Sequence, residues 1–305
     1  MKKKNNISVV IATFNSAEFI ENCLKSVDWA EEIIVVDDGS TDNTVDIVKK
    51  YTKNIHFHKS VGFVEPARNF AISKASKEWV LILDADERVP QSLASALLDI
   101  GEKPEAEAYS LPRKNIIFGK WIENTGWWPD YNIRFFKKGS VTWSDEIHSN
   151  PEISGNGSEL PSKEEYALTH YNYATISQFL QKMDRYTTIT AKQKAADGND
   201  FVWTDILMGP FREFLSRYFA RQGYKDGLHG LVLSILMAFY EFVICLKLWE
   251  LKKFFPVDER TVVREFKKIR KSQKELRYWL NTKKIDEATS KLKKQVFKTR
   301  RKLGI

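Results

Sequence analysis

The sequence predicts an α/β fold, in which a mostly parallel sheet flanked by helices is followed by an α-helical C-terminal region. In the N-terminal half, short apolar runs alternate with segments whose apolar residues recur at helical spacing. This alternation is typical of a parallel sheet covered by helices. From about residue 175 onward the apolar pattern is helical throughout. The sheet is therefore expected first and the helices last.

The expected elements follow one another in a regular order. Strands are predicted at residues 7–12, 33–36, 55–58 and 80–83. The helices between and after them are predicted at 17–28, after Thr41 or Asp42, at 66–76 and after Pro90. Residues 108–150, rich in Gly, Trp and Pro, are expected to form short strands and loops. Helices are then predicted at 175–197, 210–222 and 228–249, with two basic amphipathic helices joined near Asn281-Thr282 in the tail.

Composition and charge limit the class of protein. With 305 residues and 43% hydrophobic content, the chain can form one large domain with additions, or two domains. Cys23 and Cys245 are far apart and give neither a disulfide framework nor metal-ligand spacing, which fits a reducing compartment. The apolar run after Lys4 is short and is interpreted as a strand rather than a signal peptide. Residues 256–305 carry a net charge of +11, whereas the whole chain carries +8, so the body is close to neutral.

Polar residues follow the predicted strands at the points where the strands end. Asp84 and Asp86 come after the apolar run 79–83, Asp37-Asp38-Gly39-Ser40 ends the second strand, and Ala12-Thr13-Phe14-Asn15 ends the first. Ala67-Arg68-Asn69 lies near the start of a helix. Ligands bind open α/β sheets at the carboxyl ends of their strands. Two acids one residue apart suit a hard divalent cation that holds phosphate oxygens, although each motif taken alone could be an ordinary turn.

Together, these four motifs resemble those of family 2 glycosyltransferases of the GT-A fold, which is Rossmann-like, over residues 7–150. Residues 79–89 and 127–136 resemble the bacterial lipopolysaccharide-core β-glucosyltransferase subgroup. The resemblance implies a metal-dependent, inverting transfer of a hexose from a nucleotide sugar, expected to be a UDP-sugar, to a lipopolysaccharide-core or lipid-linked acceptor, with Mg²⁺ or Mn²⁺ as cofactor. With the charge and apolar pattern of the rest of the chain, a catalytic domain is expected at residues 1–170, a helical acceptor- and membrane-associating region at 171–255, and a basic helical tail at 256–305.

The resemblance also implies roles for individual residues. Asp86 would bind the metal, and Asp84 would contact the ribose or reach the metal through water. Asp38 would accept a hydrogen bond from the base, although a turn or cap residue is the alternative. The other implied donor-site residues are Ala12, Thr13, Asn15, Arg68 and Arg134. His148 would be a second metal ligand, but Ser149 stands where relatives commonly have Glu, which weakens roles assigned to this segment.

The catalytic base must be a carboxylate that lies near the acceptor hydroxyl and removes its proton. Asp130 and Arg134 fit an Asp-x-x-x-Arg-like arrangement found in family members. Asp130 also lies in a Trp- and Pro-rich loop, whose apolar walls could raise its pKa. Asp145 and Glu146 are the alternative bases.

The C-terminal half suggests contact with a membrane surface. Residues 230–246 contain one charge, Glu241, and are short for a span of about 20 apolar residues, so a helix on the membrane or in a bundle is expected. Lys247, Lys252 and Lys253 alternate with aromatic and apolar residues, which suits an anionic headgroup layer, and the basic tail extends this attraction. We therefore expect a cytoplasmic protein peripherally associated with the inner membrane. A soluble hairpin packed on the body and a homo-oligomer contact are alternatives.

The sequence bears differently on three other classes of function. Nucleic-acid binding is not expected, because the body contains no recognition motif. A sugar-nucleotide pyrophosphorylase would need a Gly-rich basic loop where Ala12-Thr13-Phe14-Asn15-Ser16 stands. A catalytically inactive GT-A-fold scaffold, recruited to the membrane by its C-terminal helices, remains the alternative from another class.

Overall fold

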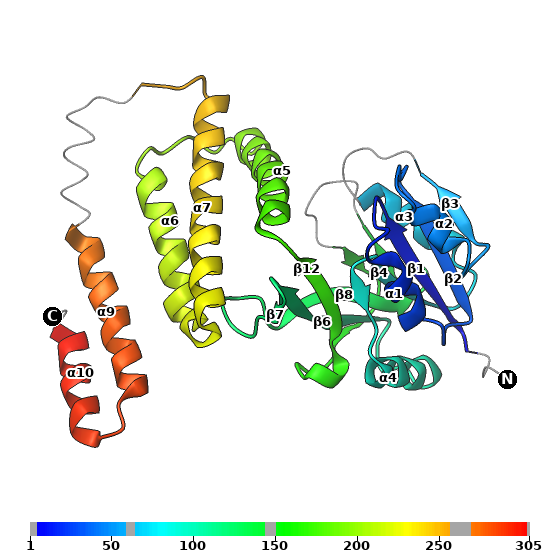
Figure 1. The fold of residues 1–305 in the computed structure, drawn as a ribbon, viewed down its shortest axis with the longest axis horizontal. Helices are drawn as coiled ribbons and strands as arrows, with labels where there is room; N and C mark the ends of the chain where they lie inside the picture. The colour runs from blue at the N-terminus through cyan, green and yellow to red at the C-terminus, as the bar shows by residue number, and fades with distance from the viewer. Residues whose placement is uncertain (1–4, 59–64, 144–150, 257–269, 304–305) are drawn as a thin grey trace. The chain divides into compact units, whose positions relative to one another are not determined.

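The structure is a computed structural model that describes residues 5–58, 65–143, 151–256 and 270–303. It divides into two compact units. Figure 1 shows the fold, coloured from blue at the N-terminus to red at the C-terminus. The sheet unit comprises Met1–Trp121 and Trp127–Asn172, and the helical unit comprises Ile122–Gly126 and Tyr173–Ile305. These units are defined by packing alone, so the three functional regions expected from the sequence stay a prediction.

The sheet unit is built on one mixed sheet with the order β3-β2-β1-β4-β8-β6-β12-β5. Its parallel part consists of β1 (Ile7–Thr13), β2 (Glu32–Asp37), β3 (Ile55–Phe57) and β4 (Trp79–Asp84). The strands β8 (Asp130–Lys137) and β6 (Ala108–Ile117) extend it as an antiparallel pair. Beyond them lie β12 (Leu168–Tyr173) and β5 (Glu87–Arg88), also antiparallel to each other. The predicted α/β class with a mostly parallel sheet is confirmed.

Short strands complete the unit at its margins. Strands β7 (Lys120–Trp121) and β11 (Gly157–Glu159) pair with β6, and β9 (Val141–Thr142) pairs with β10 (Glu152–Ile153). Residues 108–150 were expected to hold only short strands, but β6 has ten residues and β8 has eight. Pro112 and the polar residues after it hide the strand pattern of β6, because those side chains belong to a polar site rather than to an apolar face.

Helices cover both faces of the parallel strands. They are α1 (Ile20–Ser26), α2 (Thr44–Val48), α3 (Glu65–Lys74) and α4 (Gln91–Glu102). Side chains alternate across a strand, so Val9 and Ile11 join one core with α1, α2 and α4, while Val10 joins a second core with α3. A strand buried on both faces reads as a continuous apolar run. The predicted strands and helices of this half are confirmed, with ends shifted by a few residues.

In the helical unit, α5 (Ile176–Ala196) and α6 (Asp205–Leu215) pack against α7 (Leu228–Leu251). A capping box between Thr175 and Gln178 begins α5. Helix α6 begins five residues before the predicted Pro210, which lies inside it. The π-helical turn η2 (Ser216–Ala220) and the 3₁₀ helix η3 (Gly223–Asp226) connect α6 to α7. Among the described helices, α7 alone is long and apolar enough to cross a membrane, a test that core helices of soluble proteins also pass.

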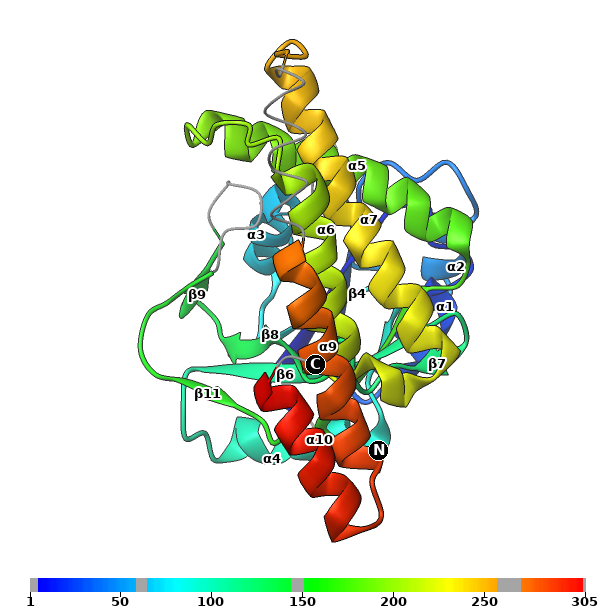
Figure 2. The ribbon, with the colours of Figure 1, turned by 90° about the vertical axis from the view of Figure 1, so that its left-hand side faces the viewer.

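The tail forms two helices, α9 (Arg270–Glu287) and α10 (Lys291–Leu303), which pack together (Figure 2). The predicted junction at Asn281-Thr282 is wrong, because α9 continues through it. Asn281 is buried and the Thr282 hydroxyl donates to the Tyr278 carbonyl at 2.9 Å, so both polar residues fit a helix. The break comes instead near Ser290, whose hydroxyl accepts from the Lys293 amide at 3.2 Å.

The segment Ile122–Gly126 lies between β7 and β8 in the sequence but belongs to the helical unit. The buried carboxylate of Asp226 accepts hydrogen bonds from the amides of Glu123 and Asn124, at 3.3 and 3.0 Å. It also accepts from the Asn124 side chain at 3.1 Å and the Thr125 hydroxyl at 3.0 Å. One carboxylate thus satisfies four donors, which fixes the segment on η3.

Candidate active site

The register of the parallel strands brings the predicted strand-end residues to one edge of the sheet. Ala12 pairs with Asp84 on β4, and Thr13 pairs with Asp37 on β2. The Asp38 amide donates to the Thr13 carbonyl at 3.0 Å, and the Thr41 amide donates to the Asn15 side chain at 2.8 Å. The loops after β1 and β2 are therefore tied to each other, as the sequence predicts for parallel neighbours.

Asp38 is largely buried and lies beside His58, with 3.2 Å between Oδ1 and Nδ1. Burial raises the pKa of the Asp38 carboxyl, and the hydrogen bond with His58 opposes this shift. The hydroxyl of Thr13 is buried and has no hydrogen-bond partner among the residues that the structure describes. A carboxylate and a free hydroxyl at one edge can together bind a polar ligand such as a nucleoside. His58 was missed from the sequence, although it follows β3 as the acids follow the other strands.

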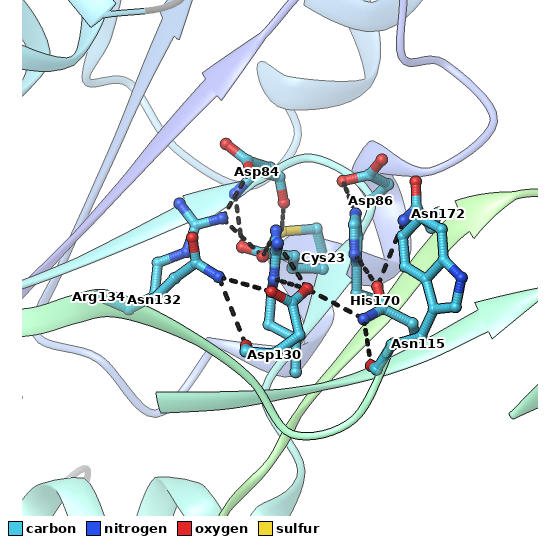
Figure 3. Close-up of polar contacts among 12 residues, drawn as sticks. Cys23, Asp84, Asp86, Asn115, Asp130, Asn132, Arg134, His170 and Asn172 are labelled. Atoms are coloured by element: carbon cyan, nitrogen blue, oxygen red, sulfur yellow. Dashed lines mark hydrogen bonds and ion pairs between the residues drawn. The ribbon is translucent and has the colours of Figure 1, made fainter. Parts of the chain in front are cut away.

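Asp84 belongs to a network of buried charges (Figure 3). Arg134 Nη2 lies 2.6 Å from Asp84 Oδ2 and 2.7 Å from Glu87 Oε1, and Arg68 approaches the other Asp84 oxygen at 3.4 Å. Burial opposes ionisation of Asp84, but the charges of Arg134 and Arg68 outweigh it and hold the pKa of this carboxyl far below its ordinary value. Asp84 is therefore ionised and fixed in place. Arg134 is only 3% exposed, so its guanidinium serves the two acids.

Asp86 faces a histidine that the sequence analysis missed. His170 Nε2, on β12, lies 3.6 Å from Asp86 Oδ1, and Figure 3 shows the two side chains directed toward each other. Pairing of β12 with β5 places His170 opposite Glu87, next to the acidic turn. The Tyr171 amide also donates to the Asp86 carbonyl at 2.9 Å. Only the alternation of apolar and polar residues in Leu168–Tyr173 suggests this strand. The sequence does not show which strand it pairs with.

A divalent cation fits between Asp86 and His170. Two ligands of one ion with bonds of about 2.1 Å lie about 3–3.5 Å apart, close to the observed separation. No group of three His, Cys, Asp or Glu side chains within the described ranges could hold an ion by itself. Further ligands would have to be phosphate oxygens and water, which is the usual arrangement for Mg²⁺. His148, the second ligand expected from the sequence, lies outside the described residues.

Asp130 is held by two neighbours on β6. Arg113 donates to its Oδ2 from Nη2 and Nε at 2.7 and 2.9 Å, and Asn115 Nδ2 donates to the same oxygen at 3.0 Å. The other oxygen, Oδ1, lies 3.3 Å from the Asn132 amide nitrogen. Any proton taken by Asp130 would therefore go to Oδ1. The alternative bases, Asp145 and Glu146, lie outside the described residues. Arg113 and Asn115 were missed because the strand that carries them was not recognised.

Comparison with protein families agrees with this geometry. Residues 8–152 match the family model described as glycosyl transferase family 2. The chain carries a family 2 glycosyltransferase domain. The matched range spans the strand ends, Asp84, Asp86 and Asp130, and it confirms the family resemblance, predicted for residues 7–150, and the prediction that the protein is a glycosyltransferase.

Curated relatives of the glycosyltransferase extend beyond this domain. The chain is 25% identical over 260 residues to the lipopolysaccharide core biosynthesis glycosyltransferase LpsC of Rhizobium meliloti, covering 82% of the chain and 94% of LpsC. It is 29% identical over 262 residues to an uncharacterized glycosyltransferase of Rickettsia typhi, covering 82% and 88%. These alignments include residues of the helical unit, because the sheet unit alone is shorter than 260 residues.

Solved structures that match the chain include two from different organisms. Staphylococcus aureus TarS 1-349 matches with a TM-score of 0.39 and 16% identity, covering 83% of this chain and 93% of that one. The mannosyltransferase PcManGT of Pyrobaculum calidifontis, in complex with GDP-Man and Mn²⁺, matches with a TM-score of 0.44 and 15% identity, covering 87% and 79%.

Proposed function

We propose that this family 2 glycosyltransferase moves a hexose from a nucleotide sugar, expected to be a UDP-sugar, to a lipopolysaccharide-core or lipid-linked glycan, with inversion at the transferred carbon. The observation that carries the proposal is the meeting of Asp38, Asp84, Asp86 and His170 at the carboxyl edge of the parallel strands. The similarity to LpsC supports the lipopolysaccharide-core acceptor.

The donor site would divide between the two loops of this edge. Asp38 would accept a hydrogen bond from the base, and the fixed carboxylate of Asp84 would orient the ribose through its remaining acceptor capacity. Thr13 offers a hydroxyl without a partner among the described residues. With its base at Asp38 and its ribose at Asp84, a nucleoside diphosphate would have its two phosphates directed toward Asp86.

Asp86 and His170 would hold Mg²⁺ or Mn²⁺, with His148 as a further predicted ligand. When bound, the ion neutralises the diphosphate and so makes the nucleoside diphosphate a better leaving group. The residues of the chain provide the fixed geometry, since Asp86 and His170 lie on adjoining backbone segments joined by the Tyr171–Asp86 hydrogen bond. Close positioning of reactants accounts for a large share of such rate accelerations.

The transfer step needs one base. A bond forms between the acceptor oxygen and the sugar carbon, the bond from that carbon to the phosphate oxygen breaks with its electron pair, and the hydroxyl proton passes to a carboxylate. Three carboxylates remain available for this step: Asp130 through Oδ1, Asp145 and Glu146. The nucleoside diphosphate leaves on the opposite face of the ring, which inverts the configuration.

The helical unit would associate with the cytoplasmic face of the inner membrane. Ile235 and Phe239 of α7 are exposed, and Phe254 and Phe255 beyond its end are 57% and 63% exposed. Lys252 and Lys253 precede these two phenylalanines, and basic and aromatic residues together suit an anionic headgroup layer. The basic residues of α9 and α10 would add to this attraction.

A panel of UDP-, GDP- and dTDP-sugars tests the proposed reaction. With Mn²⁺ present, we expect one donor to be hydrolysed slowly without acceptor and transferred in the presence of lipopolysaccharide-core oligosaccharide. Asp86→Ala should abolish metal-dependent donor binding, whereas Asp99→Ala, on the distant helix α4, should behave as the unmodified protein. Nucleotide binding without turnover of any donor would favour the inactive scaffold, and the absence of both binding and turnover would contradict the proposal.

A further inference from the structure

We propose that Asn115 is a positioning residue that fixes the ring of His170 for a metal ion, and that Asp130, paired with Arg113, fixes Asn115 in turn. The inference rests on the proposed function, because it concerns the same metal site. It assigns to Asp130 a role different from that of a proton acceptor.

The orientation of the Asn115 amide follows from its neighbours. Its Nδ2 lies 2.9 Å from the Trp127 carbonyl oxygen and 3.0 Å from Asp130 Oδ2, and both of these atoms can only accept hydrogen bonds. The nitrogen of the amide must therefore be on that side. Its oxygen must face the other way, toward His170 Nδ1 at 2.7 Å and Asn172 Nδ2 at 3.4 Å.

The orientation of Asn115 determines the tautomer of His170. A carbonyl oxygen accepts, so the Nδ1 atom that faces it must carry a hydrogen. In the neutral ring, Nε2 then carries the lone pair, and this lone pair is directed at the Asp86 carboxylate, 3.6 Å away. Two electron-rich atoms held face to face repel each other unless a proton or a metal cation lies between them. The arrangement is therefore preorganised for a metal ion.

The support behind Asn115 is rigid. Asn115 has no exposed surface and His170 is 6% exposed, so neither side chain can turn into solvent. Asp130 receives two charge-assisted hydrogen bonds on Oδ2 from the Arg113 guanidinium, and such bonds are stronger than those between neutral groups. The contacts run from Arg113 on β6 to Asp130 on β8, back to Asn115 on β6 and on to His170 on β12. Figure 3 shows Asp130, Asn115, His170 and Asp86 linked in this order. Such outer partners typically alter metal affinity by about 10- to 100-fold.

The first experiment measures Mn²⁺ affinity in the presence of UDP, by electron paramagnetic resonance of the free ion. We expect His170→Ala and Asp86→Ala to lose measurable affinity and Asn115→Ala to bind Mn²⁺ about 10- to 100-fold more weakly. Asn132→Ala is the matched control, since Asn132 contacts Asp130 but not His170, and it should stay within about threefold. Asn115→Ser is used in the same way if Asn115→Ala does not fold.

The results separate this inference from the proposed function. Loss of affinity in His170→Ala with unchanged affinity in Asn115→Ala overturns the role of Asn115 and leaves the metal site intact. Unchanged affinity in both His170→Ala and Asp86→Ala overturns the metal site itself, and the inference with it.

Two further measurements do not depend on the metal or on the stability of the Asn115 variants. Long-range proton–nitrogen spectra of the five histidines should show His170 with hydrogen on Nδ1 alone, and hydrogen on Nε2 alone would overturn the inference. Asp130→Asn keeps an oxygen that accepts from Arg113 and Asn115, so transfer should fall by no more than about tenfold. Complete loss of transfer with unchanged Mn²⁺ affinity would instead make Asp130 the base.

Discussion

The strand edge of the sheet unit and the surface of the helical unit use their side chains in opposite ways. At the strand edge, buried charges are matched within the chain, as Arg134 is with Asp84 and Glu87. On the helical unit, large apolar side chains such as Phe239 and Phe255 are exposed. The mutual attraction of a matched network offsets the desolvation of its buried charges, and its hydrogen bonds hold the carboxylate oxygens in place. Exposed apolar surface gains free energy only when a partner covers it. The strand edge is thus held rigidly, and the helical unit leaves apolar surface exposed, as the proposed membrane contact requires.

Removing the central cation of the matched network should have the largest effect. Arg134→Met leaves Asp84 and Glu87 without their shared partner, and we expect the free energy of unfolding to fall by about 3–5 kcal/mol in urea denaturation. Lys137→Met on the same strand is the control, because Lys137 and Glu78 form an exposed pair worth about 0–1 kcal/mol. If the two variants have the same free energy of unfolding, the buried ion pairs of Arg134 stabilise the protein no more than the exposed Lys137–Glu78 pair does.

The buried acid of the helical unit tests whether that unit has a rigid part of its own. Asp226→Ala leaves four donors of Glu123, Asn124 and Thr125 without their acceptor, and we expect a loss of about 2–4 kcal/mol. Hydrogen exchange should speed up at the amides of residues 123 and 124. Asp197→Ala is the control, because it removes an exposed aspartate at the end of α5 in the same unit. Unaltered exchange at residues 123 and 124 in Asp226→Ala would contradict the assignment.

The exposed apolar surface should matter for membrane contact and not for folding. Replacing Phe254 and Phe255 by Ser should weaken binding to vesicles of anionic phospholipid about 10- to 100-fold. This corresponds to about 1.4–2.8 kcal/mol for the two rings together, less than their full burial would give. Phe57→Ser is the control, since Phe57 is as exposed on the sheet unit. If the double variant co-sediments with vesicles as well as the control does, these rings do not face the membrane.

The smallest expected effect concerns pH. Burial raises the pKa of Asp38, and the ionised form is the better acceptor for a base, so UDP affinity should fall as the pH drops through this raised value. The fall should begin above the pH at which an ordinary aspartate, with pKa about 3.9, takes up its proton. It should amount to about fivefold, or about 1 kcal/mol, by calorimetry. In Asp38→Asn the acceptor does not titrate, and a persisting pH dependence would point to another group.

The parallel half of the sheet unit could be predicted because its signals lie in short stretches of sequence. Buried strands read as apolar runs, and their carboxyl ends meet at one edge, so Asp38, Asp84 and Asp86 were placed correctly at that edge. The antiparallel additions could not be predicted in the same way. Arg113, Asn115 and His170 lie on strands interrupted by polar residues, and their register depends on neighbours distant in sequence. The polarity of Asn281 suggests a helix end, but the side chain is buried, so the predicted junction of the tail helices is wrong.

The position of Ile122–Gly126 affects how the protein can be recombined with its relatives. The chain passes between the two units at residues 121/122, 126/127 and 172/173, so the units are interleaved rather than consecutive. A chimaera joined only at residue 172 would take η3, including position 226, from the relative. It would keep residues 123–125, which bond to Asp226, from this protein. Exchange of the helical unit therefore requires residues 122–126 to travel with it, and variation in these five residues should follow variation around position 226.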